Sequence, residues 1–232
     1  MTEPTASQFE LLNPQSHGKL RFSPRVVHQA HFVQIVASEF AAAAVRCPIL
    51  ITKDSGTGSF YIGAMLGFKP GQCLLPTVAD RAGFHPLNFR RDGFFISGEQ
   101  IAIDANSPRF SQTEGEPLFT DGDQPSAEMR QIQRILGQLQ DSLKTTEAFI
   151  ATLVRLKLIE PIEVSLSFDD GERLNLQGLY TVSMDSLKAL SDTDVLELFR
   201  SGDLQRIHLM HASLNQIGSL ADKRNRQIVA SS

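Results

Sequence analysis

Residues 158–180 read LIEPIEVSLSFDDGERLNLQGLY, and they carry the clearest structural pattern in the chain. Apolar side chains occupy every second position from Ile162 to Phe168, and the alternation resumes at Leu174 after the pair Asp170-Gly171. A period of two on both sides of an Asp-Gly pair predicts an antiparallel hairpin with one buried face. Because an isolated hairpin is unstable, we expect this one to join a larger sheet or to pack on a helix.

The segment before the hairpin, residues 127–157, has the pattern of one long helix. Ser126 is suited to cap its N-terminus. The apolar residues recur at spacings of three and four, which draws one stripe along a helix: Ile132, Ile135, Leu136, Leu139, Leu143, Phe149, Ile150, Leu153 and Leu156. We interpret the stripe as core packing. The alternative is a homodimer through the long helix.

The residues after the hairpin have helical patterns. Two short helices with polar N-caps are predicted over residues 183–190 and 192–199, and Gly202 is placed to end the second one. A final helix is predicted from Asp203 to about Leu220. Residues 222–227, DKRNRQ, are expected to form a polar, frayed end.

The first half of the chain predicts short strands and tight loops. Strand-forming segments lie within residues 29–36, 49–52, 60–68 and 94–103, and an alanine-rich piece at 40–45 favours a helix. Residues 54–59, DSGTGS, resemble a phosphate-binding loop. They lack the Gly-Lys-Ser/Thr ending of such loops, and a strand follows them instead of a helix, so we interpret them as a hairpin loop.

Together these patterns predict an α+β fold, in which a mainly antiparallel sheet packs on one long helix and a C-terminal helical segment. The whole chain, residues 1–232, is predicted to form a single domain. The polar stretch at 120–126 is the one candidate internal boundary. It would divide a sheet-rich N-terminal part from a helix-hairpin-helix part.

Composition excludes several functional classes. The chain has 232 residues, of which 41% are hydrophobic, so it can bury an ordinary core. Its 22 basic and 26 acidic residues give a net charge of −4, which does not favour nucleic-acid binding. The N-terminal sequence does not resemble a signal peptide, and no stretch is long and apolar enough to span a bilayer. Cys47 and Cys73 are expected to be reduced, and we predict a soluble, cytoplasmic protein.

Residues 84–91, FHPLNFRR, combine aromatic side chains with two adjacent arginines. A guanidinium group forms a flat bidentate fork for carboxylates and stacks on rings, so His85, Arg90 and Arg91 are candidates for an anion or carboxylate clamp. The alternative is an exposed loop whose arginines pair with nearby acidic residues. Those residues are Asp80, Asp92 and Glu99.

Asp104, Arg109 and Glu114 complete the candidate ligand- or partner-binding set. With Glu116, the two acidic residues of this set could form a carboxylate cluster for a metal or for acid/base chemistry. Their spacing matches no calcium loop, and loop carboxylates are usually solvated. Two histidine pairs could also bind a metal, namely His28 with His31 and His208 with His211. Since no acidic residue completes a known motif, we expect buried or half-buried structural histidines, with no metal and no cofactor.

Several short pieces, in their order and spacing, resemble the SapC family of bacterial proteins over roughly residues 12–220. The pieces are Leu12-Asn13 with His17 and Leu20, Pro86 with Arg90-Arg91 and Phe94, Asp104 with Ser107, Glu114-Gly115 with Leu118-Phe119, Thr146 with Phe149, residues 158–161, Asp170-Gly171, Gly178-Leu179-Tyr180, and Gly202 with Leu204. The chain departs from the family pattern at two positions. His85 stands in place of tyrosine and Gly93 in place of proline.

The resemblance implies an accessory or binding role that involves a protein or peptide partner. Genes of the family are described beside those for TonB-dependent outer-membrane receptors, halogenase-like proteins and cupin-like oxygenases. No complete catalytic constellation is present in the sequence, and a non-catalytic binding protein is therefore our first hypothesis. The alternative is a metal- or oxygen-dependent enzyme that modifies a peptide or small molecule, built on His85, Asp104, Glu114 and the helical histidines.

Overall fold

The chain forms two compact units, each made of two separate segments. Unit 1 comprises residues 1–28 and 85–141, and unit 2 comprises residues 29–84 and 142–232. The computed structural model describes residues 9–23, 30–75, 83–121 and 123–231. The units divide within the long helix, after Asp141, and not in the polar stretch 120–126. The expectation of a single domain stays a prediction.

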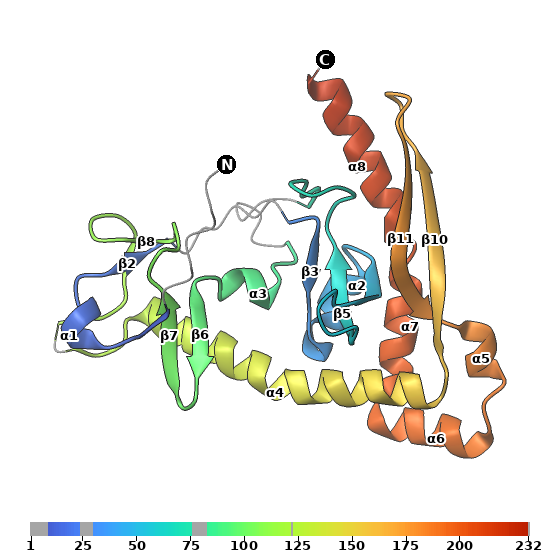
Figure 1. Ribbon diagram of the computed structural model, residues 1–232, viewed down its shortest axis with the longest axis horizontal. Helices are drawn as coiled ribbons and strands as arrows, with labels where there is room; N and C mark the ends of the chain where they lie inside the picture. The colour runs from blue at the N-terminus through green and yellow to red at the C-terminus, as the bar shows by residue number, and fades with distance from the viewer. Residues whose placement is uncertain (1–8, 24–29, 76–82, 122, 232) are drawn as a thin grey trace. The chain divides into compact units, whose positions relative to one another are not determined.

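Unit 1 contains two small antiparallel sheets (Figure 1). The first has the order β1-β7-β6 and the second the order β8-β2-β9. The first is built from β1 (Phe9–Leu11), β7 (Gln100–Asp104) and β6 (Phe94–Ser97), and the second from β8 (Phe110–Ser111), β2 (Arg21–Phe22) and β9 (Glu116–Pro117). The short helices are α1 (Pro14–His17) and α3 (Leu87–Arg90). Phe22 and Phe94 are buried in edge-to-face contact, with ring centres 5.4 Å apart, so the two sheets share one core.

Unit 2 contains a five-stranded antiparallel sheet in the order β10-β11-β4-β5-β3. Its strands are β10 (Ile159–Ser167), β11 (Arg173–Val182), β4 (Ile49–Lys53), β5 (Phe60–Met65) and β3 (Phe32–Gln34). The predicted hairpin is confirmed as β10 and β11, and it joins the sheet where Tyr180 pairs with Ile51. Its pairing shifts register between Ile162 and Val164, opposite Gly178 with its φ of 75°. A bulge therefore interrupts the alternation that the sequence suggested.

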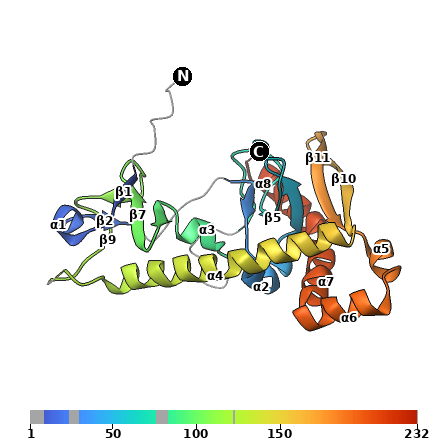
Figure 2. The same cartoon turned by 60° about the horizontal axis from the view of Figure 1, so that its bottom comes forward.

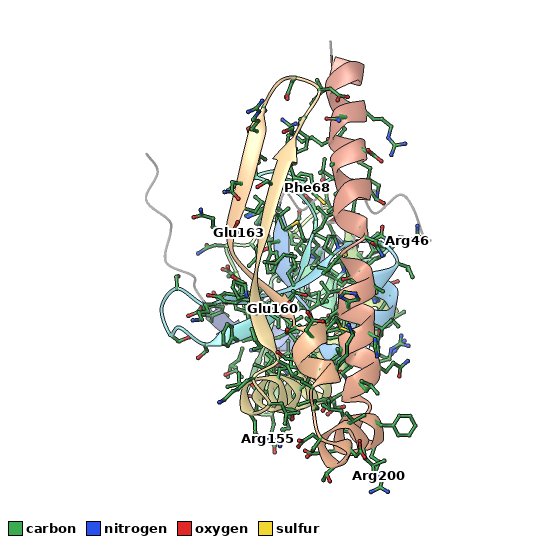
Figure 3. The ribbon with its side chains drawn as sticks, turned by 90° about the vertical axis from the view of Figure 1, so that its right-hand side faces the viewer. Arg46, Phe68, Arg155, Glu160, Glu163 and Arg200 are labelled. Carbon is green, nitrogen blue, oxygen red and sulfur yellow. The ribbon has the colours of Figure 1, made fainter. Side chains whose placement is uncertain are left out.

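The edge strand β10 is protected against pairing with another chain. Its exposed residues include Glu160, Pro161 and Glu163, of which Figure 3 labels the two glutamates. Charges block the approach of an uncharged strand, and proline has no N–H to donate to one. This edge is thus an unfavourable site for strand addition.

The long helix is confirmed as α4 (Ala127–Arg155). The Ser126 hydroxyl accepts a hydrogen bond from the Met129 N–H at 3.0 Å, as expected of an N-cap. Ile132, Ile135, Phe149 and Leu153 are buried, which confirms core packing for much of the stripe. In the part of the chain that the structure describes, neither α4 nor any other helix is long and apolar enough to cross a membrane.

The remaining helices belong to unit 2. They are η1 (Ala37–Glu39, a 3-10 helix), α2 (Phe40–Ala44), α5 (Met184–Lys188), α6 (Asp192–Ser201), α7 (Asp203–Ser213) and α8 (Gln216–Ser231). The helices α2 and α7 pack on each other (Figure 2), and both also pack on β4. Ser183 and Ser191 cap α5 and α6, and Gly202 ends α6 with a φ of 77°, as the sequence predicted.

The prediction of one final helix from Asp203 to about Leu220 was wrong, because two helices cover this segment. The Leu214 and Asn215 N–H groups bond three residues back, to His211 and Ala212, which tightens the last turn of α7 and ends it. Ser213 is fully buried there, and its hydroxyl accepts the Ile49 N–H at 2.8 Å. Residues 222–227 do not fray either. They lie in α8, where Arg224 is only 6% exposed.

Both cysteines are free thiols. Cys47 is completely buried, and this burial raises the pKa of its thiol to about 12. The thiolate is therefore scarce at neutral pH, and Cys47 acts as a small apolar core residue. Cys73 is half-buried.

Candidate functional site

Arg109, one of the predicted binding residues, holds the loops of unit 1 together. Its Nε donates to the Ser23 carbonyl at 2.8 Å, and its Nη1 donates to the carbonyls of Arg90 and Asp92 at 2.7 and 2.6 Å. The guanidinium also lies over the Phe22 and Phe94 rings. Burial lowers the pKa of Arg109 to about 10, so the group is still charged at neutral pH. These contacts make Arg109 a structural residue.

Arg91 is held in a fixed position beside the first sheet. Its Nε donates to Asn88 Oδ1 at 2.9 Å, its Nη1 donates to the Phe94 carbonyl at 3.2 Å, and its guanidinium carbon lies 5.0 Å from the centre of the Phe95 ring. Burial lowers the pKa of this guanidinium. The side chain forms no ion pair with Asp92 or Glu99, and Asp80 lies outside the described residues. The clamp hypothesis included stacking of an arginine on a ring, and Arg91 stacks on Phe95.

An apolar surface covers one face of the β1-β7-β6 sheet. The register pairs Leu11 with Ala102 and Ala102 with Phe95, so these three residues share a face. The ring of Phe9 meets that of Phe95 edge to face, with their centres 4.8 Å apart. Phe9 is 57% exposed and Leu11 49% exposed. We call Phe9, Leu11 and Phe95 the aromatic platform.

Two of the predicted site residues border the aromatic platform. Arg91 stacks on Phe95, and Asp104 pairs with Phe9 and so belongs to the same face of the sheet. Asp104 Oδ1 accepts the Asn106 N–H at 3.1 Å. A cationic and an anionic group therefore lie beside an exposed apolar surface, which suits a partner that presents both apolar and polar groups.

The other predicted residues do not join this arrangement in any contact described. His85 is half-buried and lies just before α3. Arg90 is half-buried in α3, and its carbonyl, not its guanidinium, receives Arg109. Glu114 is exposed in the turn between β8 and β9, where its N–H donates to Ser111 Oγ at 3.1 Å.

A pocket of about 560 Å³ lies on the opposite side of β1 from the aromatic platform. His17 is only 8% exposed there, with its Nε2 at 3.2 Å from Glu10 Oε2 and its Nδ1 at 3.2 Å from the Asn13 N–H. Both ring nitrogens are engaged, so these contacts fix the imidazole and close the turn of α1. The lining comprises Glu10, Gln15, Ser16, His17, Gly18, Lys19, Leu20, Ile103, Ala105 and Gln112. It offers charges of both signs to a small polar group.

No group of three or more His, Cys, Asp or Glu side chains within residues 9–23, 30–75, 83–121 and 123–228 is arranged to bind a metal. Asp104, Glu114 and Glu116 therefore do not form the carboxylate cluster considered from the sequence. His208 and His211 are exposed on α7, so the expectation that they are buried or half-buried was wrong. His31 is half-buried, and His28 lies outside the described residues.

A family model for SapC proteins matches residues 12–220, which is most of the chain. The chain belongs to the SapC family. No curated protein and no solved structure matches it. The family assignment therefore rests on the match between the sequence and the family model.

Two pieces of the SapC pattern have a clear structural role in this chain. Asn13 caps α1 by accepting the Ser16 N–H at 2.8 Å, and His17 bonds back to the Asn13 backbone. Gly115 has a φ of 98°, and a Cβ atom there would lie 2.5 Å from the Phe22 carbonyl oxygen. These positions stabilise the backbone conformation of unit 1. This structural role explains their residue types without a bound ligand.

Sequence reasoning missed the aromatic platform and the His17 pocket. The signal for the platform is the segment Phe9-Glu10-Leu11, which alternates as a strand does but is only three residues long. The signal for the pocket is His17, which the SapC resemblance included as a marker without a function. Both features depend on β7 and become visible only when Asp104 is paired with Phe9.

Proposed function

We propose that this SapC protein is a non-catalytic binding protein that recognises a peptide or protein partner through the aromatic platform. The observation that supports this proposal is that Phe9 and Leu11 remain 57% and 49% exposed beside Phe95, whereas Phe94 and Ile103 on the opposite face of the sheet are buried. A cluster of exposed apolar side chains is typical of an interaction surface. Aromatic residues at such a surface contribute much of the binding energy.

The surroundings of the aromatic platform support this proposal. Arg91 is already ordered by Asn88 and by the Phe94 carbonyl, so little side-chain entropy is lost when a partner binds. Asp104 pairs with Phe9 at the border of the surface and can select the orientation of a partner through charge. A polar rim around an apolar centre is the usual anatomy of a protein interface.

The proposal includes an accessory role in the bacterial cytoplasm, linked to TonB-dependent uptake. This part rests on the SapC resemblance, which implies receptors of that class and halogenase-like proteins as genomic neighbours. We do not favour the alternative of a metal- or oxygen-dependent enzyme, because no observation on the described residues supports it.

Binding to purified neighbour proteins by biolayer interferometry tests the proposal. We expect Phe9→Ser and Leu11→Ser to weaken binding about tenfold or more, as truncation of a central interface residue does. Val45→Ser is the matched control, because Val45 is 66% exposed and belongs to unit 2, whereas the platform residues belong to unit 1. The proposal fails if no neighbour binds the wild-type chain, or if Val45→Ser weakens binding as much as Phe9→Ser.

A further inference from the structure

The outward face of α6 in unit 2 carries two large apolar side chains. Phe199 is 69% exposed and Leu196 45% exposed, whereas Leu198 on the opposite side of the helix is fully buried. At 3.6 residues per turn, Asp192, Phe199 and Arg200 all lie within about 60° of Leu196 around the helix axis. All four residues are exposed. The helix therefore presents an apolar centre with an acid at one end and a base at the other.

The charges on this face are symmetric about Leu196. Asp192 lies in the first turn of α6 and Arg200 in the last, each one helical turn from Leu196. Neither of them forms an ion pair with the part of the chain that the structure describes. An acid at the start and a base at the end of a helix also complement its dipole, but that effect gives no reason for an exposed Phe199.

We propose that α6 is a contact between two copies of this chain, which pack antiparallel about a two-fold axis at Leu196. In this arrangement Leu196 meets its own copy, and each Phe199 covers the N-terminal part of the other helix. Each Arg200 then lies beside Asp192 of the other copy, so both charge pairs form at once. A two-fold contact requires such a self-complementary surface, and α6 provides one.

The neighbouring contacts hold α6 ready for this association. Arg155 of α4 pairs with Glu197 through Nη2 and Oε1 at 2.6 Å, and Leu198 anchors the inner side of the helix. Figure 3 shows the Arg200 side chain pointing away from the rest of unit 2. A surface that is fixed before binding loses less entropy on association.

The contact is small, so we expect a weak dimer. One face of a ten-residue helix per copy buries less area than a stable homodimer interface. Sedimentation velocity of the full chain at about 10 µM to 1 mM covers the corresponding range of dissociation constants. We expect the weight-average mass to rise from monomer toward dimer across this range.

Charge reversal tests the arrangement directly. Arg200→Glu alone and Asp192→Lys alone each place like charges at both symmetric contacts, and we expect either change to weaken the dimer about tenfold. An equimolar mixture of the two variants restores two attractive pairs in the mixed dimer. We expect the mixture to associate as tightly as the wild-type chain. Any folding defect of a single variant persists in the mixture and cannot produce this recovery.

Phe199→Ser and Val45→Ser separate the apolar contact from a general loss of exposed surface. Phe199→Ser removes one ring from each copy, and we expect it to weaken the dimer about tenfold or more. Val45→Ser should leave association unchanged. A chain that stays monomeric at every concentration overturns the proposal. So does a dimer that Phe199→Ser leaves intact, or a mixture of the charge variants no tighter than either variant alone.

This contact goes beyond the proposed partner binding and stands independently of it. It uses residues of unit 2, whereas the aromatic platform belongs to unit 1. Phe9→Ser should therefore leave dimerisation unchanged, and Phe199→Ser should leave the binding of a partner by a monomer unchanged.

Discussion

The guanidinium carbon of Arg224 lies 3.7 Å from the centre of the Phe168 ring, so that α8 closes over the residue that precedes the hairpin turn. Arg224 Nη2 also bonds Asp170 Oδ2 at 2.9 Å and Glu172 Oε2 at 2.5 Å. Glu172 pairs in addition with Lys69, near the contact between Phe68 and Phe168. Figure 3 labels Phe68, between the hairpin and α8.

We expect Arg224→Ala to lower the free energy of unfolding by about 3 kcal/mol, because it removes a stacked, buried cation, takes the ion pair from Asp170 and leaves Glu172 with Lys69 alone. Arg226→Ala is the control on the same helix, since Arg226 is exposed, and it should change stability by less than about 0.5 kcal/mol. Urea unfolding followed by circular dichroism measures both. Equal losses for the two variants would show that the Arg224 contacts contribute nothing to stability.

Acid should weaken the same cluster through Asp170. The Glu172 N–H, which donates to Oδ1 at 3.0 Å, and then Arg224 hold the pKa of Asp170 below its ordinary value of 3.8. A carboxyl with a lower pKa in the folded state stabilises the protein above its unfolded pKa, and this stabilisation is lost as the pH falls through the folded pKa. The melting temperature of the wild-type chain should therefore fall below pH 3.8 more steeply than that of Asp170→Asn.

Asp169→Asn is the control for the acid experiment, because Asp169 is the exposed neighbour of Asp170 and its side chain has no ion pair with the described residues. The melting temperature of Asp169→Asn should change with pH as that of the wild-type chain does between pH 2.5 and pH 7. This range of about 4.5 pH units covers the titration of carboxyl groups. If Asp170→Asn also follows the wild-type curve, the shifted carboxyl does not contribute to stability.

Arg109→Lys should destabilise unit 1 by about 2 kcal/mol, because one ammonium cannot replace a fork that reaches three carbonyls. Amide hydrogen exchange along β6 and β7 measures this loss locally. Arg134→Lys is the control, since Arg134 is exposed on the unit 1 part of α4. Unchanged protection in Arg109→Lys would instead favour a role for this side chain in binding.

Gly115→Ala should cost about 3 kcal/mol, and Gly98→Ala about 1 kcal/mol, although both glycines have positive φ. At Gly115 the new Cβ would also meet the Phe22 carbonyl oxygen at 2.5 Å and carbon at 2.7 Å, whereas nothing lies within 4 Å at Gly98. The pair therefore separates backbone strain from steric conflict. Urea midpoints measure both variants, and equal midpoints would exclude the steric contribution.

The sequence predicted the elements whose causes are local. The hairpin, the Ser126 cap and the Gly202 terminus each depend on a few adjacent residues, and the structure confirms them. The break after Ser213 was missed because its buried hydroxyl meets Ile49, which lies far away in the sequence. Arg224 was taken for a frayed end because the hairpin turn that buries it is equally remote.

The same distinction between local and long-range causes applies to the candidate site. The sequence suggested a clamp of arginines and rings within residues 84–91, which stays a prediction, whereas the ring that Arg91 stacks on is Phe95, four positions away. The structural role of Arg109 was not predictable, because two of its carbonyl acceptors, at Ser23 and Arg90, come from separate segments. The aromatic platform depends on strand pairing between residues 9–11 and 100–104, which no local pattern specifies.

The chain passes between the two units three times, after residues 28, 84 and 141, and the last passage lies inside the continuous helix α4. No single truncation point can therefore separate one unit from the other, because a stop after residue 141 keeps all of unit 1 together with residues 29–84 of unit 2. A premature stop within α4 would keep β3, β4 and β5 but remove β11, the neighbour of β4 in the sheet. The shortened product would keep the pairing of β4 with β5 but expose the other edge of β4, which β11 covers, and would be prone to aggregate. Truncation therefore cannot give unit 1 free of an incomplete and aggregation-prone unit 2.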